Sequence, residues 1–174
     1  MSKTLLLQPD LVLGDTVIHL TPEVIRAKNL RGLVLDVDET LIPFRESELS
    51  PELLQWVTEI RPFVDLWLVS NNLSRNRIGN IADALNVPYI FGAGKPSRKK
   101  LRQAVEAMKH PVNQVAMVGD RIFTDVLAGN RLGMFTILVE PMVVNVESSA
   151  DNFFSIRNFE VWFSQKIGIS LYKS

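Results

Sequence analysis

The sequence predicts an α/β fold in which a doubly wound, mostly parallel sheet of five strands carries helices on both faces. Five short apolar runs alternate along the chain with four stretches that have helical periodicity. Nearly continuous apolar runs are typical of strands buried on both faces, and their alternation with helices is typical of βαβ units. A length of 174 residues suits one domain with its own core.

The expected elements follow one another along the chain. Ser50, Ser74 and Ser97 are plausible helix N-caps, because a serine hydroxyl can accept a hydrogen bond from the first helical turn. We expect one domain over residues 1–174, with an N-terminal extension over about residues 1–30 and a C-terminal helix over about residues 155–171. The strands are expected at residues 32–37, 63–69, 87–91, 114–118 and 134–139, and the other helices at residues 51–60, 74–85, 97–109 and 122–132.

Composition and charge exclude several classes of function. The 19 cationic and 19 anionic side chains balance, so the overall charge does not call for nucleic acid as a partner. The absence of Cys excludes disulfides, thiolate metal sites and a Cys nucleophile, and it favours a cytoplasmic protein. No signal peptide is expected, since Pro9 and Asp10 interrupt the apolar N-terminal patch. That patch, between Leu5 and Leu13, is expected to pack in the core rather than enter a membrane.

Polar side chains follow four consecutive predicted strands. In a doubly wound sheet the carboxyl ends of the strands form the edge at which ligands bind. We therefore expect the side chains at these four ends to lie close together. They are Asp36, Asp38 and Thr40 after the first strand, Ser70 and Asn71 after the second, Lys95 after the third, and Asp120 and Asp125 after the fourth.

These residue types favour phosphate chemistry at a metal. Several carboxylates at one edge repel one another unless a cation offsets them, and carboxylate and carbonyl oxygens suit Mg²⁺. Ser70, Lys95 and the N–H groups of the turn at 92–94 can hold a phosphate. Asp36 is then placed to attack phosphorus and form an aspartyl phosphate, while Asp38 protonates the leaving oxygen and later activates water.

The pattern resembles the haloacid dehalogenase (HAD) superfamily of phosphatases. That superfamily has D-x-D-x-T after the first strand, Ser or Thr after the second, then Lys, then an acidic pair, which correspond here to Asp36/Asp38/Thr40, Ser70, Lys95 and Asp120/Asp125. More narrowly, LVSNN, GAGKPS and GDRIFTDVLAGNRLG are similar to the YqeG type of subclass IIIA, which also includes phosphatidylglycerophosphatases. The resemblance covers about residues 15–145.

The resemblance implies a Rossmann-like, HAD-like core and a Mg²⁺-dependent phosphomonoester hydrolase. Glu39 departs from the Asn that relatives often carry, which is expected to alter local charge more than mechanism. By this resemblance Asp36 is the nucleophile and Asp38 is the acid/base. The residues expected to bind phosphate are Thr40, Ser70, Asn71 and Lys95. The residues expected at the metal site are Asp36, Asp38 through its carbonyl, Asp120 and the nearby Asp125.

The resemblance also bears on the substrate, which we expect to be a phosphorylated small molecule or a phospholipid head group. The gaps at residues 41–50 and 92–95 leave no room for a cap domain, so an open site is expected. Phosphatidylglycerophosphate is the leading candidate. Six cations against one acid between Lys95 and Lys109 would attract anionic lipid, although a solvated helix face explains them equally well. Peripheral membrane contact is therefore an open alternative.

Two other classes of function stay open from the sequence alone. A receiver-like phospho-acceptor module shares clustered Asp residues and a Lys-Pro, but its Lys follows the acidic residues, whereas Lys95 precedes Asp120 and Asp125. A non-catalytic phosphate-binding module has little need for both Asp36 and Asp38. For Asp125, an alternative role is to stabilise the N-terminus of a helix through the helix dipole.

Overall fold

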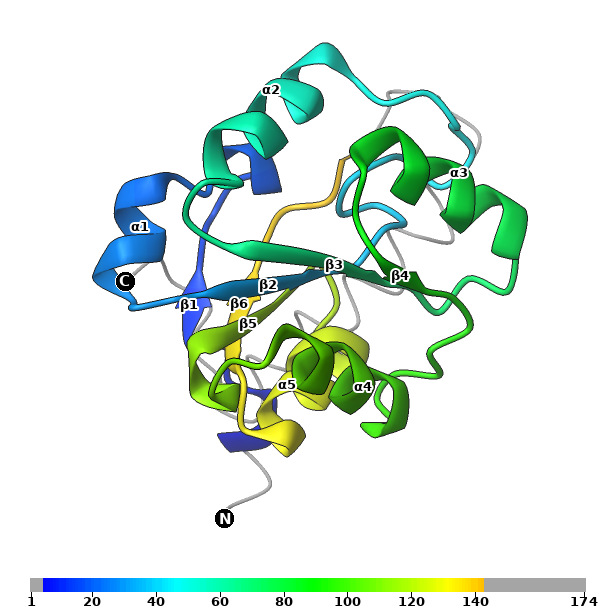
Figure 1. Cartoon of the computed structure of the whole chain (residues 1–174). Coiled ribbons are helices and arrows are strands. Elements are labelled where there is room, and N and C mark those ends of the chain that lie inside the picture. Colours follow the sequence, from blue (N-terminus) through cyan, green and yellow to red (C-terminus); the bar gives the residue numbers. More distant parts are fainter. Residues whose placement is uncertain (1–4, 143–174) are drawn as a thin grey trace.

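A six-stranded, all-parallel sheet forms the centre of the computed structural model, which describes residues 5–142 (Figure 1). The strand order is β1-β6-β5-β2-β3-β4. The predicted α/β, doubly wound class is confirmed, with one strand more than expected. The predicted C-terminal helix lies outside the described residues. The strands are β1 (Leu11–Val12), β2 (Gly32–Leu35), β3 (Asp65–Val69), β4 (Tyr89–Ile90), β5 (Val115–Gly119) and β6 (Phe135–Leu138).

Helices cover both faces of this sheet. The α1, α2 and α3 helices lie on one face, and α4 and α5 lie on the other (Figure 1). None of the helices within residues 5–142 is both long enough and apolar enough to span a membrane. The α-helices are α1 (Pro22–Ala27), α2 (Pro51–Ile60), α3 (Arg75–Leu85), α4 (Lys99–Met108) and α5 (Leu127–Leu132); the short turns are η1 (Leu5–Leu7), η2 (Val17–His19), η3 (Val112–Gln114) and the π-helical η4 (Ile122–Val126).

The sequence did not predict β1 or α1. A two-residue strand is too short to show periodicity, and β1 is recognisable only through its pairing with β6, in which Leu11 lies opposite Ile137. The six-residue α1 is likewise too short for a clear amphipathic pattern. Leu11 and Leu13 are buried in the core, as expected for this part of the N-terminal apolar patch.

Two of the three predicted N-caps are confirmed. The hydroxyl of Ser50 accepts a hydrogen bond from Leu53 N at 3.1 Å, and that of Ser74 accepts one from Arg77 N at 3.3 Å. The N-cap position predicted at Ser97 was wrong by one residue, because α4 has Arg98 at its N-cap, although the Ser97 hydroxyl accepts a hydrogen bond from Lys99 N at 3.4 Å. Ser97 instead belongs to the preceding turn, in which its N–H donates to the Gly94 carbonyl at 2.9 Å.

The central strands are held from both faces, which fixes the residues at their carboxyl ends. Successive side chains of a strand point to opposite faces of the sheet. Accordingly, Leu33 and Leu35 of β2 pack with Leu53 of α2 in one core, whereas Val34 packs with Leu101 of α4 in the other. All five side chains are buried, so β2 cannot shift without disturbing two cores.

The buried Trp56 ties α2 to the segment that follows η2. Its indole Nε1 donates to the Leu20 carbonyl at 2.9 Å. We expect Trp56→Phe to retain much of the apolar contact but to lose this buried hydrogen bond, at a cost of about 1–3 kcal/mol in the free energy of unfolding. Urea unfolding measures the change, and an unchanged midpoint with an unchanged slope would contradict it.

Candidate active site

A cavity of about 300 Å³ lies at the carboxyl edge of the sheet and collects nearly all the predicted site residues. Thr40 is the exception: it is fully buried and lies outside the cavity lining, against Asp120. The parallel sheet therefore brings four strand ends together, as the sequence predicted. Seven of the predicted residues line the cavity: Asp36, Asp38, Ser70, Asn71, Lys95, Asp120 and Asp125.

Lys95 lies between two buried carboxylates. Its Nζ is 2.7 Å from Asp36 Oδ1 and 2.8 Å from Asp125 Oδ1, and all three side chains are buried. Burial alone would lower the pKa of Lys95, but Asp125 and Asp36 outweigh it and raise that pKa. Lys95 is therefore held as an ammonium, the form that can attract a phosphate.

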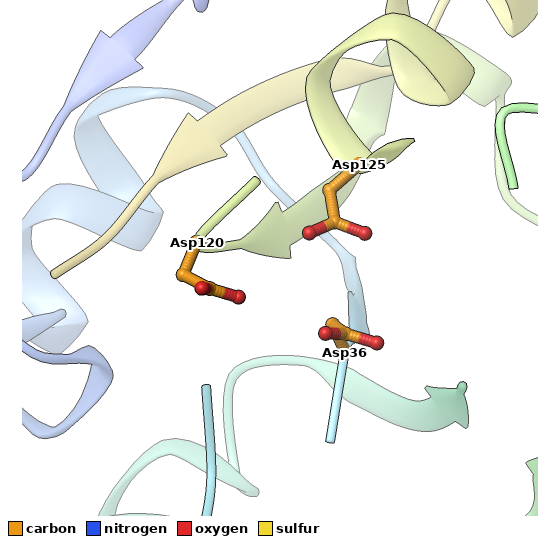
Figure 2. Close-up of side chains that lie close together, drawn as sticks. All are labelled: Asp36, Asp120 and Asp125. Atoms are coloured by element: carbon orange, nitrogen blue, oxygen red, sulfur yellow. The ribbon is translucent and has the colours of Figure 1, made fainter. Parts of the chain in front are cut away.

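Asp36, Asp120 and Asp125 form an acidic triad with metal-binding geometry (Figure 2). Each carboxylate offers an oxygen, and the three oxygens lie within 4.8 Å of one another. Asp36 follows β2, Asp120 follows β5, and Asp125 comes from the π-helical turn η4. The triad arises because β2 and β5 are neighbours in the sheet.

The hydrogen bonds of the triad leave room for a cation. Thr40 Oγ1 donates to Asp120 Oδ1 at 3.1 Å, whereas Asp120 Oδ2 is buried and accepts no hydrogen bond from any described residue. Asp125 Oδ1 contacts Lys95 in an ion pair at 2.8 Å. A buried carboxylate oxygen without a partner, such as Asp120 Oδ2, is costly, and hard divalent cations prefer carboxylate oxygens. The residues present therefore fit a cation such as Mg²⁺.

The charge balance of the triad leads to the same conclusion. Burial raises the pKa of Asp36 to about 7, because the opposing effect of Lys95 offsets only part of it and Asp125 raises it further. Burial, with Asp125 and Asp36 adding to it, raises the pKa of Asp120 well above its usual value. One ammonium does not balance three buried carboxylates, and a divalent cation would favour their ionised forms.

The Asp38 side chain lies outside this triad. Its Oδ2 accepts a hydrogen bond from Asn72 Nδ2 at 3.0 Å, and its Oδ1 pairs with Arg77 Nη1 of α3. The metal role predicted for Asp38 concerned its carbonyl, and that role stays a prediction. Sequence reasoning did not identify Arg77, since nothing in its helix marks it as part of the site.

Asn71 contacts the main chain of Lys95 with both ends of its amide. Asn71 Oδ1 accepts from Lys95 N at 2.7 Å, and Asn71 Nδ2 donates to Lys95 O at 3.0 Å. Asn71 therefore fixes the backbone that carries the ammonium. The neighbouring Ser70 accepts a hydrogen bond from Asn72 N at 3.0 Å, which leaves its hydroxyl proton available to a ligand.

Two cations of the basic segment between residues 95 and 109 donate to backbone carbonyls. Lys100 Nζ donates to the carbonyls of Phe91 and Gly92, each at 2.9 Å. Arg98 Nη1 donates to the Arg131 carbonyl at 2.9 Å. Lys100 therefore orders the loop that carries Lys95, and Arg98 connects the start of α4 to α5, so these two side chains do not act simply as a solvated positive patch.

Glu39 occupies an unfavourable backbone region beside the site. Its φ of 63° lies in the left-handed region, which Asn adopts more readily than Glu. The Glu39 carboxylate accepts a hydrogen bond from Phe44 N at 2.9 Å, and this contact secures the turn. Phe44 lines the cavity and is 58% exposed.

Comparison with known proteins agrees with the class that this fold and site define. A family model described as HAD-hydrolase-like matches residues 92–148. The chain is 34% identical over 146 residues to the probable phosphatase YqeG of Bacillus subtilis (strain 168), covering 83% of this chain and 81% of that protein. The chain therefore belongs to the HAD superfamily, in the family of YqeG-type phosphatases. This membership favours a phosphatase over a receiver-like or a non-catalytic module.

More distant similarities extend the comparison. The chain is 30% identical over 138 residues to phosphatidylglycerophosphate phosphatase 1, chloroplastic, of Chlamydomonas reinhardtii; the match covers 74% of this chain and about half, 51%, of that protein. A solved structure from Listeria monocytogenes serotype 4b, of an uncharacterized protein, has a TM-score of 0.53 at 13% identity and covers 79% of this chain and 99% of that chain. A putative HAD-like phosphatase from Mesorhizobium loti has a TM-score of 0.50 at 18% identity, covering 81% and 88%. These structures support the HAD-like fold.

The triad predicts a pH-dependent stabilisation by a divalent cation, with Mg²⁺ as the test ion. Because the pKa of Asp36 is about 7, this carboxylate is largely protonated at pH 5 and largely ionised at pH 8. Mg²⁺ binds ionised carboxylates and competes with protons, so we expect it to raise the melting temperature more at pH 8 than at pH 5. Thermal unfolding with and without Mg²⁺ measures the effect.

A matched pair of variants assigns this effect to the triad. Asp120→Asn should abolish most of the stabilisation by Mg²⁺, whereas Glu106→Gln, on the exposed side of α4, should retain it. Equal stabilisation of both variants would show that Mg²⁺ binds elsewhere.

Proposed function

We propose that the protein is a Mg²⁺-dependent phosphomonoester hydrolase that acts through an aspartyl phosphate on Asp36. The observation that carries this proposal is the buried arrangement of Asp36 against Lys95 within the acidic triad. Asp36 and Asp120 would hold Mg²⁺, with Asp125 beside them, and the bound ion would offset negative charge on the phosphoryl oxygens. The same cavity has room for a phosphate.

The proposed reaction has two displacement steps. First, a carboxylate oxygen of Asp36 bonds to phosphorus, the bond from phosphorus to the leaving oxygen breaks, and Asp38 gives its proton to that oxygen. Second, a water oxygen bonds to phosphorus, Asp38 takes the proton from this water, and the bond from phosphorus to Asp36 breaks. The products are an alcohol and inorganic phosphate, and both Asp residues return to their starting states.

Three other side chains support these steps. Lys95 opposes the effect of burial on Asp36 and supplies positive charge for the phosphoryl group, and the Ser70 hydroxyl is free to donate to a phosphoryl oxygen. Thr40 was predicted to bind phosphate, but its hydrogen bond to Asp120 favours a role in orienting that carboxylate. The contacts of Asn71 with Lys95 likewise favour a supporting role.

For the substrate we propose the head-group phosphate of an anionic phospholipid, with phosphatidylglycerophosphate as the candidate. The name of the Chlamydomonas relative supports this class. The rim of the site supports it too: Leu73 is 82% exposed next to Asn72, and Phe44 lines the cavity while 58% exposed. The guanidinium of Arg75 and the ammonium of Lys100 lie over the ring of Phe91. Exposed apolar side chains beside cations are typical of surfaces that contact anionic membranes.

The reaction is tested with p-nitrophenyl phosphate and Mg²⁺. We expect turnover by the unmodified protein, no measurable turnover by Asp36→Asn, and a loss of about 100-fold or more in kcat for Asp38→Asn, since general acid–base catalysis contributes at least that much. The control is Asp65→Asn at the opposite edge of the sheet, where Asp65 pairs with His110. Full activity of Asp36→Asn would exclude Asp36 as the nucleophile.

Membrane contact is tested by flotation with vesicles that contain phosphatidylglycerol. We expect Leu73→Ser to reduce the fraction of protein that floats, because it removes an exposed apolar side chain at the rim, and to leave hydrolysis of p-nitrophenyl phosphate unchanged. Leu54→Ser, which changes an exposed leucine on α2, is the matched control. If the unmodified protein does not float with these vesicles, the substrate is a soluble phosphate ester. The proposal for the reaction then still stands.

A further inference from the structure

We infer that Arg77 is a positioning residue for the proposed reaction, which holds the Asp38 carboxyl on the leaving-group side of the cavity and ties it to the segment that carries Phe44. Arg77 lies in the first turn of α3, and Asp38 lies beyond the end of β2. The inference rests on the proposed role of Asp38 as acid and base.

Asp38 is held through both of its carboxyl oxygens. Arg77 Nη1 pairs with Oδ1, and Asn72 Nδ2 donates to Oδ2 at 3.0 Å. Asn72 is itself fixed, because its Oδ1 accepts from Ser74 N at 2.8 Å and its carbonyl accepts from Gly92 N at 2.8 Å. Contacts at both oxygens, made from the start of one helix, define the orientation of the carboxyl plane.

This orientation matters because a metal site lies close by. Asp36 is only two residues away and belongs to the triad, whose buried oxygens fit a divalent cation. An unrestrained Asp38 carboxylate would be attracted to that cation and would become a further ligand. A carboxyl bound in that way could not deliver a proton to the leaving oxygen. The guanidinium of Arg77 would compete with a bound cation for Asp38 and would keep the two carboxylates in different roles.

Arg77 also fixes the chain segment at the mouth of the cavity. Its Nη2 donates to the Glu46 carbonyl at 3.0 Å and to the Pro43 carbonyl at 3.4 Å, and its Cζ lies 5.9 Å from the centre of the Phe44 ring. The side chain of Arg77 is only 16% exposed. A planar guanidinium can make these contacts together, whereas a lysine ammonium cannot reach all of them.

The leaving group distinguishes this role from a merely structural one. Phenyl phosphate and p-nitrophenyl phosphate share a phenyl ring and differ by one nitro group. Phenolate leaves less readily than p-nitrophenolate, so its departure depends more on an acid. We expect Arg77→Met to lower kcat by about 10-fold with p-nitrophenyl phosphate and by about 100-fold with phenyl phosphate, while KM changes much less; neither loss exceeds what general acid catalysis itself contributes. Arg77→Lys should recover part of the loss with phenyl phosphate.

Arg26→Met is the matched control. Arg26 lies on α1 outside the cavity lining, and its Cζ lies 5.0 Å from the centre of the Phe63 ring. This variant should leave the ratio of the two kcat values unchanged. If urea unfolding shows that Arg77→Met does not fold, the ratio of the two kcat values is measured for Arg77→Lys instead. A ratio in Arg77→Lys equal to that of the unmodified protein would overturn the inference.

Asp38→Asn, measured in the same assays, separates the two proposals. If Asp38→Asn loses no more kcat with phenyl phosphate than with p-nitrophenyl phosphate, Asp38 is not the acid. The proposed role of Asp38 and the inferred role of Arg77 then both fail. If Asp38→Asn shows the larger loss but the Arg77 variants lose both activities equally or not at all, only the role of Arg77 is overturned.

Discussion

The buried ammonium of Lys95 between Asp36 and Asp125 is the interaction on which the site depends. Carboxylates this close and this buried repel one another, and without a cation the site would favour their neutral forms. Lys95 offsets part of that charge, and a bound divalent cation would offset more of it. The surrounding loop holds Lys95 in place: Asn71 contacts both main-chain groups of Lys95, and Lys100 donates to the carbonyls at the start of the loop.

The parallel sheet determines which carboxylates can meet Lys95. The N–H of Asp36 donates to the Val118 carbonyl at 2.9 Å, so the hydrogen bonding between β2 and β5 continues to the first carboxylate of the site. At the end of β5, Gly119 lets η4 approach closely, because a Cβ there would lie 2.3 Å from Asp125 Oδ2. A side chain at this position would displace Asp125 from the triad. The triad therefore needs both the strand order and a glycine.

The sequence identified the parts of the site that follow from strand order. Asp36 and Asp120 each follow a long, apolar strand, so their meeting could be expected from the parallel topology alone. The contacts of Asp38 with Arg77 could not be expected, because they depend on how the chain turns back after β2, where Asp38 pairs with Ile42 in an isolated bridge. Such a turn has no periodicity. The same limit applies to β1, whose two residues show no pattern until β6 pairs with them.

That turn also explains how two carboxylates separated by one residue can have different chemistry. In a continuing strand, Asp36 and Asp38 would point to the same face and both would reach the metal site. β2 ends at Leu35 instead, the chain turns so that Asp38 forms an isolated bridge with Ile42, and the Asp38 carboxyl pairs with Arg77 of α3. Asp36 is then surrounded by the ammonium and the triad, and Asp38 by a guanidinium and an amide. These different environments are what the proposed roles of nucleophile for Asp36 and acid for Asp38 require, although the two residues are of the same type.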